Sequence, residues 1–299
     1  MTFTTSLKEE LSRMELSPIE ARYELFSFIK YIGKIGKEIT ITLENASVAR
    51  KIYKDIKLVY NFNPTLTIRI QKRFRIKQIY IITIRENISK IKNDIFPLNL
   101  NIETNEEKIA YLQGAFLAIG NISNPQTSGY HLEYICNSED DAKFIQLLLK
   151  DFNLNAKIVI RGYKYIVYLK ASENISDLLK LFKATQSMFF FEDIRIYRDH
   201  KNMVNRLNNC EISNQTKTIE AGLKQIEDIK YLKENNLVDL LDDKMKTIIM
   251  AREKYPESSL TELAEIISTE YKYKIGKSGV NHHFIKLSKM VSSHKDNNR

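Results

Sequence analysis

The sequence has few cysteines and no long apolar run. Its two cysteines, Cys136 and Cys210, lie far apart in 299 residues and outside any paired spacing, so they supply neither a disulfide framework nor a zinc site. The N-terminal segment is charged at positions 8–10 where a signal peptide would be apolar, and the most apolar runs, such as 79–84, are far too short to cross a bilayer. The sequence therefore predicts neither secretion nor membrane insertion, and a reducing cytoplasm fits best.

Acidic residues are outnumbered by basic ones, and the excess is concentrated in two stretches. The net charge is +9, with 46 Lys and Arg against 37 Asp and Glu. Residues 47–92 hold twelve basic residues against two acids, and residues 271–299 hold seven against one. A basic balance favours an anionic polymer as partner. Two separate basic stretches predict two contact surfaces.

The chain nearly repeats itself at an offset of 87 residues. Residues 25–33 align with 112–120, and the tetrapeptide Glu-Asn-Ile-Ser at 86–89 recurs at 173–176. Two markers at one offset indicate a duplication. Each copy has the same expected order of elements, which is helix, hairpin, helix, hairpin, helix, and this order predicts an α+β fold.

Local signals place these elements along each copy. In the first copy, one helix ends near Gly33. Asn45 caps a second helix at about 46–60, and two strands follow, at about 65–75 and 78–85. In the second copy a helix ends at Gly120 and Ser138 caps the next helix, which runs to about 152. The strands of that copy are expected at 130–136, 156–161 and 163–170.

The strand beginning at Thr65 separates apolar from cationic side chains, because side chains alternate between the two faces of a sheet. One face is expected to lie on the core and consists of Leu66, Ile68, Ile70, Phe74 and Ile76, with Lys72 as its only polar member. The opposite face is cationic and gives four candidate DNA contacts, Arg69, Arg73, Arg75 and Lys77. An ordinary solvated face is the alternative. The nearly uniform sign of the charge favours phosphate binding, and the second copy repeats the trend more weakly at Lys157, Arg161, Lys164 and Lys170.

The C-terminal residues 237–299 predict a separate helical module. Asp242 or Asp243 caps its first helix, Ser259 and Glu262 form a capping box for the second, and Ser278 caps the third. In the third helix the apolar residues recur at helical spacing: Val280, Phe284, Leu287 and Val291. This pattern leaves a polar and basic face pointing away from the core.

A short helix followed by a basic, capped helix is typical of a helix-turn-helix, in which the second helix enters the major groove. A generic three-helix bundle is the alternative. The candidate DNA-binding residues of this module are Lys277, Ser278, Asn281, His282, Lys286 and Lys289. His282 and its neighbour His283 point in different directions on a helix and have no third ligand nearby, so neither a metal site nor a cofactor is expected.

The stretch 195–234 is expected to be mostly helical, rich in Asn and Arg, and polar apart from one apolar stripe. The stripe consists of Ile219, Leu223, Ile226 and Ile229. Docking of this stretch against the first domain is favoured over contact with DNA.

The helices ending at Gly33 and Gly120 resemble the paired LAGLIDADG helices of homing endonucleases, in which two pseudo-symmetric copies present a saddle of antiparallel strands to duplex DNA. Gly114 suits a close approach of the two helices. In active members of that fold, the residue before the closing glycine is an acid that binds the catalytic metal. Ile32 and Ile119 occupy these positions here, and an apolar side chain cannot bind a hard cation. The resemblance therefore implies no catalytic residue, no metal and no nuclease activity.

Four strings are similar to the WhiA family of bacterial DNA-binding regulators: Tyr111 to Ala118, Asn205-Arg206 with Asn209-Cys210-Glu211, Gln225 to Ile229, and Lys277 to His282. The resemblance covers residues 3 to about 291. It implies a degenerate LAGLIDADG-like domain joined by a linker to a helix-turn-helix module similar to region four of sigma factors. It also implies a sequence-specific transcriptional regulator, not an enzyme, that is cytoplasmic, associated with the nucleoid, and linked to cell division and, in sporulating species, to sporulation.

The expected architecture follows from these signals together. A duplicated LAGLIDADG-like domain spans 1–190 with repeats at about 19–105 and 106–190, a helical linker spans 191–236, and an all-α helix-turn-helix domain spans 237–299. Double-stranded DNA is the expected partner, with base contacts from the C-terminal helix. The alternative is that the first domain is a platform for a partner transcription factor or RNA polymerase, or a non-specific DNA clamp.

Overall fold

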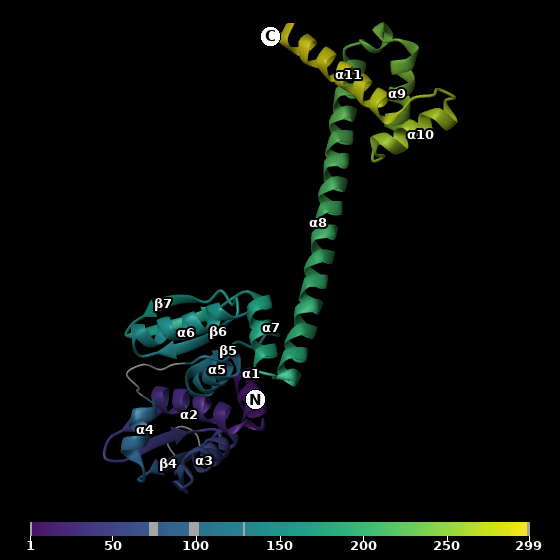
Figure 1. The fold of residues 1–299 in the computed structure, drawn as a ribbon. Coiled ribbons are helices and arrows are strands. Elements are labelled where there is room, and N and C mark those ends of the chain that lie inside the picture. The colour runs from purple at the N-terminus through teal and green to yellow at the C-terminus, as the bar shows by residue number, and fades with distance from the viewer. Residues whose placement is uncertain (1, 72–76, 96–101, 128, 298–299) are drawn as a thin grey trace. The chain divides into compact units, whose positions relative to one another are not determined.

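The computed structural model of this chain describes residues 2–71, 77–95, 102–127 and 129–297 (Figure 1). The chain divides into two compact units, Met1–Asp199 and His200–Arg299, and each unit has its own hydrophobic core. Helix α8, Thr185–Glu234, begins in the first unit and ends in the second. The boundaries at residues 190 and 236 expected from the sequence remain a prediction.

The first unit contains two copies of one arrangement, preceded by helix α1, Phe3–Ser12. The first copy runs α2 Pro18–Ile32, β1 Lys34–Ile35, β2 Ile39–Leu43, α3 Ala46–Tyr60, β3 Thr65–Gln71, β4 Lys77–Ile84 and α4 Ile88–Ile95. The second runs α5 Asn105–Ile119, β5 Gly120–Ile122, β6 Leu132–Cys136, α6 Glu139–Asp151, β7 Lys157–Arg161, β8 Lys164–Leu169 and α7 Ser172–Leu181. The antiparallel sheets have equivalent strand orders, β1-β2-β4-β3 and β5-β6-β8-β7. The predicted duplication and the α+β class are confirmed.

Side-chain caps fix where the helices begin. The Asn45 side chain accepts hydrogen bonds from the backbone N–H groups of Ser47 and Val48, at 2.9 and 3.1 Å, and so caps α3. Ser138 caps α6 by accepting from the N–H of Asp141. Both caps are the ones expected from the sequence, because a cap depends only on residues within one turn of it.

Helices α2 and α5 pack against each other at the centre of the unit, as Figure 1 shows. A Cβ atom added to Gly114 would lie 2.1 Å from the backbone oxygen of Glu24 and 2.2 Å from the Ser27 hydroxyl oxygen. Further along the pair, the hydroxyl groups of Tyr31 and Tyr111 lie 3.3 Å apart. The close approach expected at Gly114 is therefore present, and any larger side chain would force the helices apart.

The register of the first sheet assigns a face to each strand residue. Ile41 of β2 pairs with Ile82 of β4 on the face that α3 covers, and both are buried. Arg69 of β3 pairs with Ile79 of β4 on the opposite, open face. Of the expected cationic face, Arg69 therefore lies on the open face of the sheet.

The other face of β3 departs from expectation. Leu66, Ile68 and Ile70 were expected on the core, but 39%, 57% and 57% of their surfaces are exposed. The reason is position in the sheet: β3 is the outer strand, and the helices pack over β2 and β4 instead. Strand alternation predicted which residues share a face, but not whether a helix covers it. Lys72, Phe74 and Ile76 lie outside the described residues.

The second unit consists of the end of α8, a short 3-10 helix η1 at Val238–Leu240, and helices α9 Asp243–Lys254, α10 Leu260–Glu270 and α11 Lys277–Asn297. Asp242 caps α9, and Ser259 with Glu262 forms the expected capping box of α10. Helix α11 begins two residues earlier than a cap at Ser278 would place it, since the N–H of Val280 donates to the carbonyl of Gly276. Ser278 therefore lies within the first turn and is not the cap.

The apolar stripe of helix α8 was expected to dock against the first domain, but its buried member, Ile229, packs in the core of the second unit. Ile229 and Leu232 are in the core of the second unit, whereas 44% of Ile219 and 55% of Leu223 are exposed. The helix contacts the rest of its unit mainly near its C-terminal end, so the earlier turns remain open to solvent. Within the described part of the chain, no helix combines the length and apolar character needed to span a membrane.

Candidate nucleic-acid interface

Helix α11 has one buried face and one polar, exposed face. The buried residues are those expected from the spacing: Val280, Phe284, Leu287 and Val291. The candidate contacts are all exposed: Lys277, Ser278, Asn281, His282, Lys286 and Lys289. Since Lys277 and Asn281 are one helical turn apart and Lys277 opens the helix, the first turns present a cation and an amide, which are the kinds of side chain that contact phosphates and bases in DNA-binding helices. This arrangement suits a helix entering the major groove from its N-terminal end.

The two adjacent histidines have different surroundings. His282 is exposed, whereas His283 is half-buried and its Nδ1 atom is enclosed without a hydrogen-bond partner among the described residues. Burial lowers the pKa of His283 below the ordinary histidine value. His282 is therefore the member of the pair that is available to a ligand, while His283 belongs to the packing of the domain.

A buried arginine anchors the turn that leads from α9 into α10. Only 1% of Arg252 is exposed, and its Nη1 atom donates to the carbonyl oxygens of Tyr255, Pro256 and Ser258, the last at 2.6 Å. Its guanidinium carbon also lies 5.5 Å from the centre of the Phe284 ring on α11. One side chain thus joins the turn before α10 to the helix that carries the candidate contacts, and the spacing pattern alone did not reveal it.

The open face of the first sheet carries part of the second candidate surface. Arg69 is exposed there. Arg73 and Arg75 lie outside the described residues, and Lys77 is described only by its backbone, which pairs with Gln71. Two isoleucines of β4, Ile79 and Ile81, share this face with Arg69, so the described part mixes apolar and cationic groups.

The second sheet has a weaker basic face and a polar group that sequence reasoning missed. Lys157, Arg161, Lys164 and Lys170 are all exposed. Next to the end of α5, the two carboxylate oxygens of Glu133 lie 3.3 Å from the Asn121 side-chain nitrogen and 3.0 Å from His131 Nε2. The Asn121 side-chain oxygen in turn accepts from the Thr4 hydroxyl at 2.7 Å. These bonds join α1 to the second sheet through residues widely separated in the chain.

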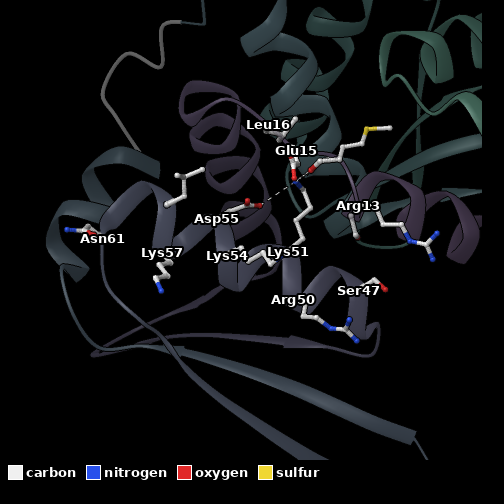
Figure 2. Close-up of a pocket in the computed structure, with 13 residues that line it drawn as sticks. Arg13, Glu15, Leu16, Ser47, Arg50, Lys51, Lys54, Asp55, Lys57 and Asn61 are labelled. Carbon is white, nitrogen blue, oxygen red and sulfur yellow. Dashed lines mark hydrogen bonds and ion pairs between the residues drawn. The ribbon is translucent and has the colours of Figure 1, made fainter.

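Part of the first basic stretch lies on a different surface from the one expected. Arg50, Lys54 and Lys57 project from α3 and line a hollow of about 960 Å³ beside the segment Ser12–Leu16 (Figure 2). Because α3 covers the face of the sheet opposite to Arg69, these cations do not belong to the open sheet face. Their spacing within the expected helix 46–60 already places them along one side of it.

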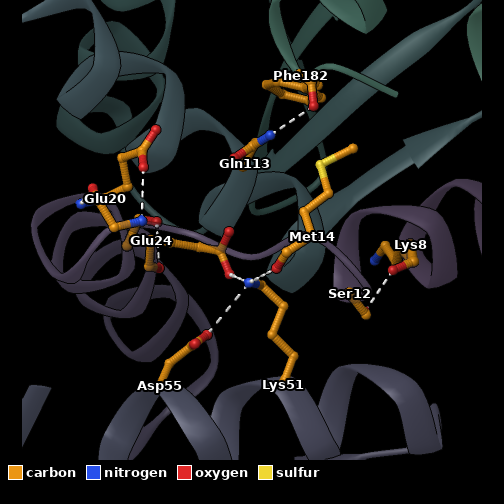
Figure 3. Close-up of polar contacts among 11 residues, drawn as sticks. Lys8, Ser12, Met14, Glu20, Glu24, Lys51, Asp55, Gln113 and Phe182 are labelled. Atoms are coloured by element: carbon orange, nitrogen blue, oxygen red, sulfur yellow. Dashed lines mark hydrogen bonds and ion pairs between the residues drawn. The ribbon is translucent and has the colours of Figure 1, made fainter. Parts of the chain in front are cut away.

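A buried ionic group lies beneath this hollow. Lys51 Nζ is 3.2 Å from Glu24 Oε1 and 3.7 Å from Asp55 Oδ2, and it donates to the Met14 carbonyl (Figure 3). All three charged side chains are buried. Burial raises the pKa of both carboxyl groups above the ordinary range, since one lysine offsets only one of two negative charges. The group connects α2, the central helix of the first repeat, to α3.

The helix ends that resemble the homing-endonuclease motif carry no acid. Ile32 and Ile119 precede Gly33 and Gly120 and are half-buried. Glu133 is the carboxylate near the end of α5, and both of its oxygens already have partners. Across residues 2–71, 77–95, 102–127 and 129–297, no group of three or more His, Cys, Asp or Glu side chains is placed to hold a metal ion.

The chain matches three domain families along most of its length. Residues 18–95 match the WhiA N-terminal LAGLIDADG-like domain, residues 108–201 the WhiA LAGLIDADG-like domain, and residues 204–291 the WhiA C-terminal HTH domain. The probable cell division protein WhiA of Exiguobacterium sibiricum is 38% identical, over 97% of this chain and 96% of its own. The chain belongs to the WhiA family. The WhiA of Staphylococcus saprophyticus, also named a probable cell division protein, is 38% identical over the same shares.

Two solved WhiA structures have the same fold. A full-length DUF199/WhiA from Thermotoga maritima superposes with a TM-score of 0.59 at 23% identity, covering 98% of this chain and 99% of that one. The N-terminal LAGLIDADG domain of DUF199/WhiA gives 0.51 at 26% identity, covering 60% and 90%. The predicted fold class, two LAGLIDADG-like repeats followed by a helix-turn-helix domain, is thereby confirmed.

Proposed function

We propose that this chain is a sequence-specific DNA-binding transcriptional regulator that reads the major groove through α11. The observation that carries the proposal is the exposed face of α11, on which Lys277, Asn281 and His282 are gathered in the first two turns. Asparagine is suited to adenine, and a cation at the N-terminal end of a helix is suited to a phosphate. The names of the relatives, probable cell division proteins, suggest that the target genes include genes of division.

Recovery of bound genomic fragments tests this proposal directly. The full chain is incubated with sheared genomic DNA at near-physiological salt, and bound fragments are sequenced. We expect a few promoter segments that share a short motif. The double variant Asn281→Ala and His282→Ala is expected to lose the motif, whereas Ser292→Ala with Ser293→Ala, near the end of the same helix, keeps it. Even recovery across the genome by the natural chain would contradict sequence-specific reading.

A second proposed role belongs to the first unit. The open sheet face that carries Arg69 is proposed to contact phosphates without reading sequence. Arg73 and Arg75, which lie outside the described residues, are expected from the sequence to contribute to the same contact. The presence of Ile79 and Ile81 on the same face favours the alternative, a surface for a partner regulator or polymerase. The two are separated by the salt dependence discussed below.

The proposed action involves no bond cleavage. Ile32 and Ile119 occupy the positions at which active homing endonucleases hold their metal ions, and isoleucine offers no oxygen ligand. Incubation of supercoiled plasmid with the full chain and magnesium is expected to leave the plasmid intact. Nicking that survives repeated purification and disappears when Glu133 is changed to Gln would overturn this part of the proposal.

A further inference from the structure

A groove runs between the middle of α8 and the start of α10, within the second unit. Its volume is about 780 Å³. One wall belongs to α8 and the other to the turn and first residues of α10. The lining residues are Leu207, Cys210, Glu211, Asn214, Gln215, Thr218, Ile219, Glu257, Ser259 and Glu262.

The α8 wall is a continuous stripe with an apolar component. Its members recur three or four residues apart from Leu207 to Ile219, which places them along one side of the helix over about 18 Å, or roughly three turns. The exposed fractions of Leu207 and Ile219 are 59% and 44%. These two large apolar side chains lie at opposite ends of the stripe and offer two apolar contact points about three turns apart, with mostly polar side chains between them.

The rim of the groove is acidic in a chain that is otherwise basic. Glu211, Glu257 and Glu262 line it, and the described lining residues include no lysine or arginine. Within the described residues, none of the three forms an ion pair with a basic side chain. Three unpaired negative charges in a chain with a net charge of +9 repel phosphates and attract cations.

The walls are fixed before any partner arrives. The three bonds from Arg252 hold the turn that carries Glu257. The capping box with Ser259 holds Glu262, since Glu262 Oε2 accepts from the Ser259 N–H at 2.7 Å. Gly222 lets α8 approach that turn, because a Cβ there would lie 2.6 Å from the Pro256 carbonyl oxygen. Binding to such a preformed groove costs little conformational entropy.

We propose that this groove binds a basic amphipathic helix of a partner protein. The apolar side chains of such a helix would pack on Leu207 and Ile219, and its flanking lysines or arginines would pair with the three glutamates. The length of the stripe matches about three turns of a bound helix. This proposal does not depend on DNA binding by α11.

The charge of the groove selects this occupant over two others. DNA is disfavoured because its phosphates would meet the glutamates. A second copy of this chain, joined by a two-fold axis through the groove, would bring both sets of three glutamates together, since such an interface uses the same patch twice. A basic helix meets neither repulsion, because its lysines and arginines are attracted to the glutamates instead of being repelled by them.

A peptide-binding measurement on the full chain tests the proposal. The probe is a labelled synthetic helix of about 18 residues with leucines three and four apart and lysines and arginines beside them, and affinity is read by fluorescence anisotropy. The triple variant Glu211→Gln, Glu257→Gln and Glu262→Gln keeps the capping box, because glutamine also serves at that position. We expect it to bind roughly tenfold more weakly.

The matched control removes the same charge elsewhere in the unit. Glu220→Gln, Glu227→Gln and Glu265→Gln change exposed glutamates that do not line the groove, and we expect the affinity to stay within about twofold. Equal weakening in both triple variants would mean that the peptide responds to net charge alone. That result, or no weakening in either, overturns the proposal.

The exposed thiol of Cys210 supplies a second readout, because Cys210 lines the groove and the other cysteine, Cys136, is buried. Saturating peptide is expected to slow alkylation of Cys210 severalfold, and Leu207→Ala to weaken the peptide without disturbing the fold. An unchanged alkylation rate of Cys210 would contradict binding of the peptide in this groove. Self-association in sedimentation that Leu207→Ala abolishes would replace the partner helix by a second copy.

Discussion

A buried ionic group in the first unit, which no sequence motif marks, makes the stability of the fold depend on pH. Glu24 and Asp55 flank Lys51 in a buried site, and burial raises the pKa of both carboxyl groups. In the folded chain a proton is therefore retained above the pH at which an unfolded carboxyl group releases it. The stability linked to these groups is fully present below the ordinary carboxyl pKa and is lost as pH rises through the raised value.

The variant Glu24→Gln tests this linkage. Glutamine has the size of the protonated carboxyl group but cannot ionise, so we expect the free energy of unfolding to fall less between pH 5 and pH 7.5 than in the natural chain, by about 1 kcal/mol. Chemical denaturation across this range measures the difference. Glu86→Gln, an exposed change in a turn, should retain the natural pH dependence. A natural chain whose stability rises over this range would contradict the raised pKa of Glu24.

Arg252 is the corresponding residue of the second unit. Replacement by methionine keeps much of the apolar volume but removes the donors to three carbonyl groups. We expect a loss of about 3 kcal/mol, because three partly buried carbonyl groups lose a charged hydrogen-bond donor. Amide hydrogen exchange at residues 255–263 should accelerate accordingly, while Arg206→Met, an exposed change on α8, leaves it unaltered. Exchange that is equally slow in both variants would show that the turn does not depend on Arg252.

At the scale of elements, the crossing of α2 and α5 is the contact most sensitive to a small change. Gly114→Ala places a methyl group 2.1 Å from the Glu24 carbonyl oxygen, which no side-chain rotation relieves. We expect a loss of at least about 2 kcal/mol in the unfolding free energy of the first unit. Gly36→Ala is the control, since the nearest atom to its added carbon is 3.8 Å away. Equal stabilities of the two variants would contradict close packing at Gly114.

The elements also show which parts of the fold follow from sequence. The caps at Asn45, Ser138 and Ser259 were predictable because each involves residues within one turn. The exposure of Ile68 was not, because it depends on how far a helix from another part of the chain extends over an edge strand. Helical spacing alone placed Asn281 on the exposed face of α11.

The groove beside α8 and the buried group around Lys51 lie beyond such reasoning for the same reason. Glu24 and Lys51 lie on different helices, and Leu207 and Glu257 line one groove from different helices and turns. Their approach follows from packing of whole helices and not from any local spacing. Residues that lie on different elements and act together can be identified only once the structure shows how those elements pack.

At the scale of the whole molecule, basic residues form surfaces on both units, and one helix joins the units. The exposed face of α11 carries the candidate base contacts Asn281 and His282, whereas the described part of the sheet face carries Arg69 together with Ile79 and Ile81. If both candidate surfaces bind DNA, we expect the second unit to supply specificity and the first to supply salt-dependent affinity. This division would also explain why the second unit tolerates an acidic groove: that groove lies on residues of α8 and α10, apart from the exposed contacts of α11.

The full chain carrying Arg69→Ala, Arg73→Ala and Arg75→Ala tests this division. Each phosphate contact contributes about 0.9 to the slope of log affinity against log salt, so the loss of three contacts should flatten the slope by about 2 to 3 while the recognised motif stays the same. The control Arg50→Ala, Lys54→Ala and Lys57→Ala removes equal charge from the other side of the sheet and should change the slope much less. An unchanged slope in the first variant would leave the sheet face without a role in DNA binding and assign it to a protein partner. Equal flattening in both would mean that overall charge, and not a particular face, sets the affinity.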